Sequence, residues 1–169
     1  MLKMKNTTTT QIGDLILGID HVAIVVENID SSIALYASAL GFSLQERSEV
    51  TGDHSGMLYA VMKSGAATMV LVQGTTPESQ ISKFLAVFGA GMHHIAFAVA
   101  NLDKTIDKVI KAGGITDTPV ISDNGIRQAF LQRDPTTGVR VELIERHGVS
   151  FSEQNVEHLF RALEEKDLF

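Results

Sequence analysis

Cysteine and tryptophan are both absent from this 169-residue chain, and proline occurs only three times. Without cysteine the chain cannot form disulfides, so any metal site has to use histidine and carboxylate ligands. The sequence also lacks an apolar run of about 18 residues, the length that a membrane-spanning helix needs. The formal net charge is −6 and there is no long basic run. Nucleic acid is therefore not an expected partner, because phosphate binding needs clustered lysine and arginine.

The polar, threonine-rich start of the chain, residues 1–16, lacks the apolar core of a signal peptide and predicts a flexible tail. Hydrophobic residues make up 44% of the sequence, enough for the core of one compact domain. We expect this domain over residues 17–148 and a C-terminal helical segment over 149–169. These features favour a cytoplasmic protein that acts on a small molecule.

An internal repeat organises the sequence. Residues 19–30 read IDHVAIVVENID, and residues 92–103 read MHHIAFAVANLD. The alignment pairs His21 with His94, and the same register later pairs Gly65 with Gly138. Matches in one register over such a length indicate that the chain contains two copies of one structural unit.

Each copy predicts the same order of elements. A β-branched apolar run, typical of a strand, precedes apolar residues at helical spacing. Asp30 and Asp103 are predicted to cap the two helices, and Gly41 and Gly114 to end them in the left-handed conformation. The predicted strands lie near 19–26, 44–50, 57–63 and 66–73, then near 92–99, 115–121, 127–133 and 138–145. The sequence thus predicts an α+β fold of two βαβββ modules, about 17–75 and 90–148, with a C-terminal helix over 153–166.

Two histidines and one glutamate stand out as candidate metal ligands. Because side chains alternate between the two faces of a strand, His21 shares a face with Ala23, and His94 shares one with Ala96. These small neighbours leave space above the sheet, so both histidines are predicted to point into one cavity. Glu142 lies within the apolar run VRVELI, where an unpaired carboxylate is costly to bury. Two histidines and one carboxylate with open positions are typical of non-haem Fe(II) oxygenases.

Each of these residues also has an ordinary explanation. A single histidine on an apolar strand is usually hydrogen-bonded in the core, and Glu142 could pair with Arg140. The recurrence of histidine at one position of the repeat favours the metal site. His93 has the opposite strand parity to His94 and is predicted to face away from the metal unless the strand bulges. The remaining histidines and the charged residues after Glu142 are expected at the surface: His54, Glu145, Arg146, His147 and His158.

The paired units open with I-D-H-V-A and H-H-I-A and close with V-E-L-I-E, and they resemble the vicinal oxygen chelate (glyoxalase/bleomycin-resistance/dioxygenase) superfamily. The resemblance covers nearly the whole chain from Leu17 onward. It implies a cup-shaped mixed sheet around a divalent metal, with Fe(II) as the first expectation and Co, Ni, Zn or Mn as alternatives. It also implies a homodimer.

Two segments, 79–97 and 141–165, resemble the catalytic domain of 4-hydroxyphenylpyruvate dioxygenases more narrowly. In that family the strand that carries the glutamate ligand leads through a loop to a C-terminal helix that closes the active site. The resemblance places the metal ligands, and hence the catalytic centre, at His21, His94 and Glu142. The substrate-binding positions that it implies are Gln80, Gln132, Phe151, Asn155 and Phe160.

The chain also departs from that family. The family's first large domain is missing, His93 replaces a glutamine, and Val156 replaces an aromatic residue that can stack on a substrate ring. Specificity for an aromatic substrate is therefore not implied. Core packing of the last helix explains Phe151 and Phe160 as well as a substrate contact does.

The sequence is compatible with three functions. The first is an Fe(II)-dependent dioxygenase that acts on a small 2-oxo acid with O2. The second is a lyase or isomerase of the glyoxalase or methylmalonyl-CoA epimerase type, in which a metal polarises a carbonyl group and a carboxylate moves a proton. The third is a non-catalytic small-molecule binding protein, which would not need the three ligands.

A fourth ligand position separates the first two functions. Relatives of the lyase or isomerase type commonly take a Glu or Gln ligand from the last strand of the first module. The repeat alignment places Met69 there, with Gln73 as the alternative in another register. Since a thioether is a poor ligand for a hard divalent ion, Met69 favours the dioxygenase.

Overall fold

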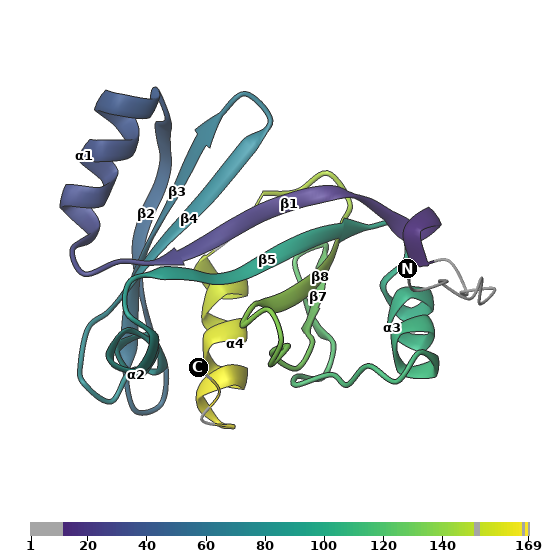
Figure 1. Ribbon diagram of the computed structural model, residues 1–169. Helices are drawn as coiled ribbons and strands as arrows, with labels where there is room; N and C mark the ends of the chain where they lie inside the picture. Colours follow the sequence, from purple (N-terminus) through teal and green to yellow (C-terminus); the bar gives the residue numbers. More distant parts are fainter. Residues whose placement is uncertain (1–11, 151–152, 167, 169) are drawn as a thin grey trace, which may run out of the picture.

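The computed structural model describes residues 12–150, 153–166 and 168, and two successive βαβββ units follow one another along the chain (Figure 1). The first unit comprises β1 (Ile16–Val25), α1 (Ile29–Leu40), β2 (Ser43–Thr51), β3 (Gly56–Ser64) and β4 (Ala67–Gly74). The second comprises β5 (Gly91–Val99), α3 (Leu102–Lys111), β6 (Ile121–Asp123), β7 (Ile126–Phe130) and β8 (Arg140–Arg146). Outside the units lie the 3-10 helix η1 (Ile12–Leu15), α2 (Gln80–Phe88) and α4 (Glu153–Glu164).

The eight strands form one mixed sheet in the order β2-β3-β4-β1-β5-β8-β7-β6. The antiparallel pair β1–β5 joins the two units at the centre of the sheet. Each unit is completed by a parallel pair, β1 with β4 and β5 with β8. The sheet curls around α4, which confirms the predicted α+β fold with a cup-shaped sheet (Figure 1).

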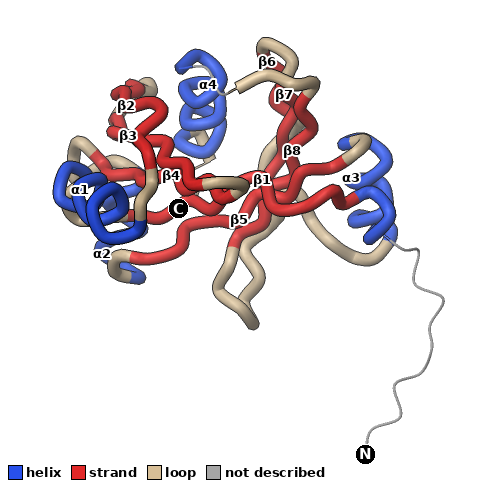
Figure 2. The backbone as a smooth tube through the Cα atoms, turned by 90° about the horizontal axis from the view of Figure 1, so that it is seen from above, coloured by secondary structure: helices blue, strands red, loops and turns tan. Residues whose placement is uncertain are grey.

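The last helix bridges the two halves of the cup. Figure 2 shows α4 between β2 and β6, the outermost strands of the sheet, and α4 contacts both. The carboxylate of Glu164 accepts hydrogen bonds from the Asp53 backbone N–H (2.7 Å) and the Ser55 hydroxyl (2.5 Å), in the loop between β2 and β3. On the other side the Lys166 Nζ donates to the Asp117 carbonyl (2.6 Å). The C-terminal helix is therefore held by both modules.

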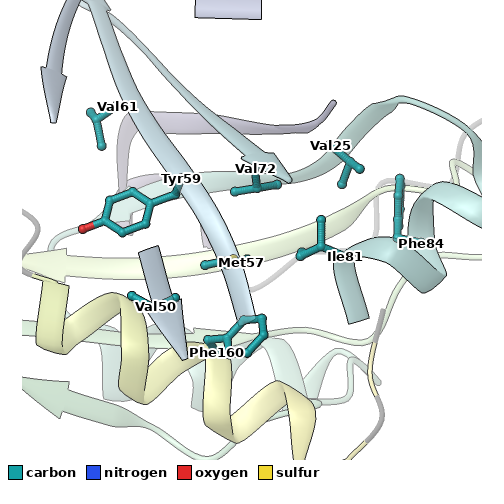
Figure 3. Packing of buried hydrophobic residues seen from close by; sticks show 9 residues of the cluster. All are labelled: Val25, Val50, Met57, Tyr59, Val61, Val72, Ile81, Phe84 and Phe160. Atoms are coloured by element: carbon teal, nitrogen blue, oxygen red, sulfur yellow. The ribbon is translucent and has the colours of Figure 1, made fainter. Parts of the chain in front are cut away.

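The buried side of α4 completes the core on the concave face. Phe160, which is only 1% exposed, packs with apolar side chains of β1, β2, β3, β4 and α2 (Figure 3). On the convex face, α1 covers a second cluster and α3 a third. Alternate strand residues thus serve opposite layers, as the period of two in the sequence predicts. None of the described helices is long and apolar enough to span a membrane.

The helix caps differ from the prediction. Asn28 and Asn101, not Asp30 and Asp103, cap α1 and α3, with side-chain oxygens that accept from backbone N–H groups three residues on. The two aspartates lie in the first helical turn and pair with arginines. Asparagine and aspartate are both good caps, so composition alone did not separate them.

The glycine at the end of each helix behaves differently in the two modules. Gly41 ends α1 in the left-handed conformation (φ 69°), as predicted. The prediction for Gly114 is wrong, because α3 ends at Lys111 and Gly113 has the positive φ, 90°.

The second module also has less strand than expected. Instead of a strand over 115–121 there is an isolated bridge, Thr116 to Leu131, followed by the three-residue β6. Pro119 interrupts this segment, and proline cannot donate to a strand ladder. At the N-terminus, residues 1–11 of the predicted tail lie outside the described residues, whereas η1 and the start of β1 already occupy 12–16.

Candidate metal centre

The three predicted ligands meet on the concave face of the sheet. The structure brings His21 on β1, His94 on β5 and Glu142 on β8 together, with ligand atoms that all lie within 4.8 Å of one another. The Nε2 atoms of the two histidines are 3.2 Å apart. The Glu142 Oε2 is 3.4 Å from the His21 Nε2 and 3.2 Å from the His94 Nε2. All three side chains are buried.

Strand register explains this convergence. The β1–β5 pairing sets His21 opposite Ala96 and Ala23 opposite His94, and the β5–β8 pairing sets Ala96 beside Glu142. Ala23 and Ala96 have no exposed surface and separate the ligands. Their methyl groups leave the room that two imidazoles and a carboxylate need above the sheet.

The donor set fits a divalent cation. Burial alone would raise the pKa of Glu142, but the neighbouring His21 and His94 lower it to about 2, so the carboxylate is ionised. A fully buried carboxylate is costly unless it is paired or bound to metal. Two imidazole nitrogens and one carboxylate oxygen suit iron and the other first-row divalent ions, and three protein ligands leave positions for a substrate.

The two histidines differ in basicity. Burial lowers the pKa of His94 despite its contact with Glu142. Burial acts in the same direction on His21, but hydrogen bonds to Asp20 and Glu142 outweigh it and raise the pKa of His21 to about 9. In the metal-free protein, His21 therefore carries the proton of the cluster, and a metal has to displace it.

An aspartate–arginine pair orients His21. The His21 Nδ1 lies 2.8 Å from the Asp20 Oδ1, which leaves the Nε2 directed at the site. The guanidinium of Arg146 donates through its Nε and Nη2 to both oxygens of Asp20, each at 2.8 Å. A carboxylate behind a histidine ligand fixes its ring orientation and raises its basicity. Arg146 shares strand parity with Glu142, a signal that sequence reasoning missed.

The surface expectation holds for only some of the charged residues. His54, His147 and His158 are exposed, as expected. The expectation of a surface position is wrong for Arg146, which is half-buried, and for Glu145, which is 8% exposed. The Glu145 Oε2 accepts from the Leu102 backbone N–H (2.6 Å) at the start of α3, a contact between segments far apart in sequence.

His93 approaches the site through a bulge. The β1–β5 register shifts between Ala23 and Ile24, and His93 is the extra residue on β5. A bulge re-aims side chains, and the His93 Nδ1 lies 2.7 Å from the His94 Nδ1. His93 therefore contacts the far side of the His94 ring, which was expected only if the strand bulged.

The fourth ligand position is occupied by Val70. Ala23 pairs with Val70 just as Ala96 pairs with Glu142, so Val70 is the counterpart of Glu142 in the first module. The prediction of Met69 was wrong by one residue, because Val70 lies 47 residues after Ala23 whereas Glu142 lies 46 residues after Ala96. Met69 packs on the opposite face with the α1 cluster.

Gln73 is not available as a ligand either. Its Oε1 accepts the Ile29 backbone N–H (2.7 Å) at the start of α1. Arg140, the ordinary partner considered for Glu142, instead lies with its Nη2 3.3 Å from the Asp117 Oδ2. Among the described residues, the ion-pair partners of Glu142 are therefore His21 and His94.

Three of the predicted substrate-binding residues lie under or on α4. Gln80 is buried and donates from its Nε2 to the Phe160 carbonyl (3.2 Å). Asn155 is fully buried, and its Oδ1 accepts from the Nε2 of Gln128 (3.4 Å), a buried residue that sequence reasoning missed. Gln132 is exposed, apart from this group. Phe151 lies outside the described residues.

A cavity of about 550 Å³ opens beside the His21 end of the site. Its lining includes both the Asp20–Arg146 pair and the concave-face residues Val61 and Ala98. Glu46 also lines it, and its Oε1 accepts a hydrogen bond from the Tyr59 hydroxyl. The cavity is large enough for a small organic substrate.

Comparison with known proteins identifies the family. The model described as "Glyoxalase/Bleomycin resistance protein/Dioxygenase superfamily" matches residues 18–143. The mitochondrial methylmalonyl-CoA epimerase of Homo sapiens is 30% identical over 128 residues, 74% of this chain and 72% of the relative. The crystal structure of methylmalonyl-CoA epimerase from Mycobacterium tuberculosis has a TM-score of 0.66 at 28% identity, covering 78% of this chain and 89% of that one.

A third protein shares the fold over a longer stretch. The structure of a triply substituted 4-hydroxymandelate synthase from Streptomyces coelicolor has a TM-score of 0.78, covering 96% of this chain and 57% of that one. At 21% identity the likeness concerns the fold alone. With the family model matching most of the chain, the protein belongs to the glyoxalase/bleomycin resistance protein/dioxygenase superfamily, the vicinal oxygen chelate proteins.

Proposed function

We propose that this protein is a non-haem Fe(II)-dependent oxygenase that acts on a small 2-oxo acid. The observation that carries the proposal is the three-ligand set with the aliphatic Val70 at the fourth position. His21, His94 and Glu142 would hold the metal. When bound, iron supplies the redox chemistry by which O2 oxidises a chelated 2-oxo acid.

The protein's own residues prepare the site for that chemistry. Asp20 and Arg146 hold the His21 ring in one orientation. Phe160 and the rest of the concave core exclude water, which strengthens electrostatic interactions inside the site. The Oε1 atoms of Gln80 and Gln128 are buried, and no described residue donates a hydrogen bond to them, so each can accept one from a substrate and orient it.

The sequence relatives favour a second candidate, an epimerase that moves a proton next to a carbonyl group. Two of the proteins that resemble this chain at 28–30% identity are methylmalonyl-CoA epimerases. Such a reaction needs a base as well as a metal. Burial and the neighbouring Glu46 raise the pKa of Tyr59 above its usual value, so Tyr59 stays protonated. Glu46, in the cavity wall, is the base that this candidate requires.

One pair of assays separates the candidates. Oxygen consumption by the Fe(II)-loaded protein is measured across aromatic and aliphatic 2-oxo acids, with His94→Ala as the inactive control. Exchange of deuterium into methylmalonyl-CoA is measured on the Co(II)-loaded protein. We expect oxygen uptake that survives Glu46→Gln and is lost in His94→Ala. Deuterium exchange that Glu46→Gln abolishes, without oxygen uptake, would instead establish the epimerase.

The remaining expectations about cellular context stay predictions. They are the homodimer, the cytoplasmic location and the identity of the native metal. Metal analysis of the purified protein and its mass in solution test two of them directly.

A further inference from the structure

Two arginines and a histidine gather at the end of the site opposite the cavity. Arg140 begins β8, is 3% exposed and pairs in register with His94 on β5. Its guanidinium carbon lies 6.0 Å from the centre of the Phe130 ring. That ring in turn meets His94 edge-on, with ring centres 4.9 Å apart. Arg140 is thus separated from the metal ligands by one aromatic ring.

The hydrogen-bond donors of this group are largely unused. Among the described residues, Arg140 uses only its Nη2, towards Asp117. Arg133 uses only its Nη1, which donates to the Gly138 carbonyl at 2.8 Å and the His93 carbonyl at 3.5 Å. Five nitrogen atoms are buried without a hydrogen-bond partner in the part of the chain that the structure describes: the Nε and Nη2 of Arg133, the Nε and Nη1 of Arg140, and the Nε2 of His93. Buried donors in folded proteins almost always have a partner.

The charges are also unbalanced. Arg133 lies close enough to Arg140 for its charge to lower the pKa of Arg140, and Asp117 is the carboxylate that acts on both arginines. One positive charge in this group therefore has no counter-charge among the described residues. A buried cation of this kind is costly unless an anion binds to it.

We propose that Arg133, Arg140 and His93 form a binding site for a carboxylate or an oxyanion of similar size. The Nε and Nη2 of Arg133 form the edge of the guanidinium that can donate two parallel hydrogen bonds to a carboxylate. The Nε and Nη1 of Arg140 and the Nε2 of His93 supply further donors. Gln132 is exposed and Arg133 is only half-buried, so the anion enters from this rim of the cup.

The anion is not the group that chelates the metal, because Phe130 lies between Arg140 and His94. It is either a second carboxylate of the substrate or a free anion that binds beside the site. The anion site itself is independent of the proposed reaction. The assignment to a second carboxylate of a 2-oxo acid rests on the proposed function.

Sulfate binding to the full-length, metal-free protein tests the site. Thermal unfolding and calorimetric titration are performed with sodium sulfate against sodium chloride at equal ionic strength. We expect sulfate to stabilise the wild type and the control Arg47→Met, whose arginine pairs with Asp30 at the surface. In Arg140→Met the affinity should fall at least about tenfold, and Arg140→Lys should restore part of it, because lysine keeps the charge but not the planar fork.

The stability of the variants separates an anion site from a purely structural role. Without sulfate, Arg140→Met should unfold close to the wild-type temperature, because loss of the ion pair with Asp117 is offset by removal of a buried charge that lacks a full complement of partners. Lower stability of Arg140→Met together with unchanged sulfate binding would overturn the proposal. So would the absence of any sulfate-specific stabilisation of the wild type.

The source of the anion is tested with two acids of equal chain length on Ni(II)-loaded protein. 2-Oxoglutarate carries a second carboxylate and 2-oxopentanoate does not. We expect 2-oxoglutarate to bind at least about tenfold more tightly, and to lose this advantage in Arg140→Met. Equal binding of both acids would assign the site to a free anion. If neither acid binds while sulfate does, the proposed function fails and the anion site stands.

Discussion

The proton on His21 makes both stability and metal binding depend on pH. Its pKa is raised from 6.5 to about 9, and each unit is equivalent to about 1.4 kcal/mol. The protonated His21 therefore contributes about 3 kcal/mol to the stability of the metal-free protein. Because the folded-state pKa is the higher one, this contribution is complete below pH 6.5 and is lost as the pH rises to about 9.

Glu142 acts in the opposite pH range. Its pKa is lowered from 4.5 to about 2, so its contribution is present above pH 4.5 and is lost as the pH falls towards 2. The contact between His21 and Glu142 contributes to both pKa shifts, so their energies do not add. The metal-free protein should therefore be most stable between about pH 4.5 and 6.5.

Metal binding should show the reverse trend, because the metal displaces the His21 proton. Below pH 9 the apparent affinity for Co(II) should rise by about tenfold for each pH unit. Urea unfolding of the metal-free protein and Co(II) titration between pH 6 and 9 measure the two effects. His21→Gln should abolish the alkaline loss of stability, and His54→Gln, at an exposed position, should retain it. Stability and Co(II) affinity that both stay constant over this range would refute the reasoning.

Three further changes test particular contacts. Asp20→Asn should weaken Co(II) binding by about 10- to 100-fold, measured by titration, whereas Asp30→Asn at the surface should not. Phe160→Ala should lower the free energy of unfolding, measured in urea, by about 3–5 kcal/mol, whereas His158→Ala at an exposed position should stay close to wild type. Equal effects of the two substitutions would contradict the packing of α4 in the core. Val70→Glu should add a fourth ligand, so that Co(II) binds more tightly and oxygen uptake falls; unchanged Co(II) binding would mean that position 70 does not reach the metal.

Several features depended on register that sequence patterns do not specify. The repeat alignment placed Met69 at the fourth ligand position, and the strand pairing moved it to Val70. A shift of one residue reverses the face of a strand, so a difference of one residue between the two modules decided this position. The helix α2, between the modules, was not predicted at all. Its Ser79 cap and its apolar face, with Ile81 and Phe84 in the core, are local signals that could have found it.

Contacts between residues that are far apart in the sequence could not be predicted either. Arg146 was expected at the surface, but the cup brings it onto Asp20, and the bulge at His93 turns that ring towards His94. The cluster of Arg133 and Arg140 depends in the same way on Asp117 and Phe130. Such contacts arise from the curvature of the sheet, which no local pattern encodes.

The sequence by itself determined the two-module plan and brought out His21, His94 and Glu142. A repeated histidine and a glutamate inside an apolar run are visible without coordinates, because strand periodicity and the cost of burying charge act locally. The tertiary structure decided what surrounds those three residues: the aliphatic fourth position, the Asp20–Arg146 support and the unpaired arginines. Each of these depends on which strands lie side by side, and that is set by packing over the whole sheet.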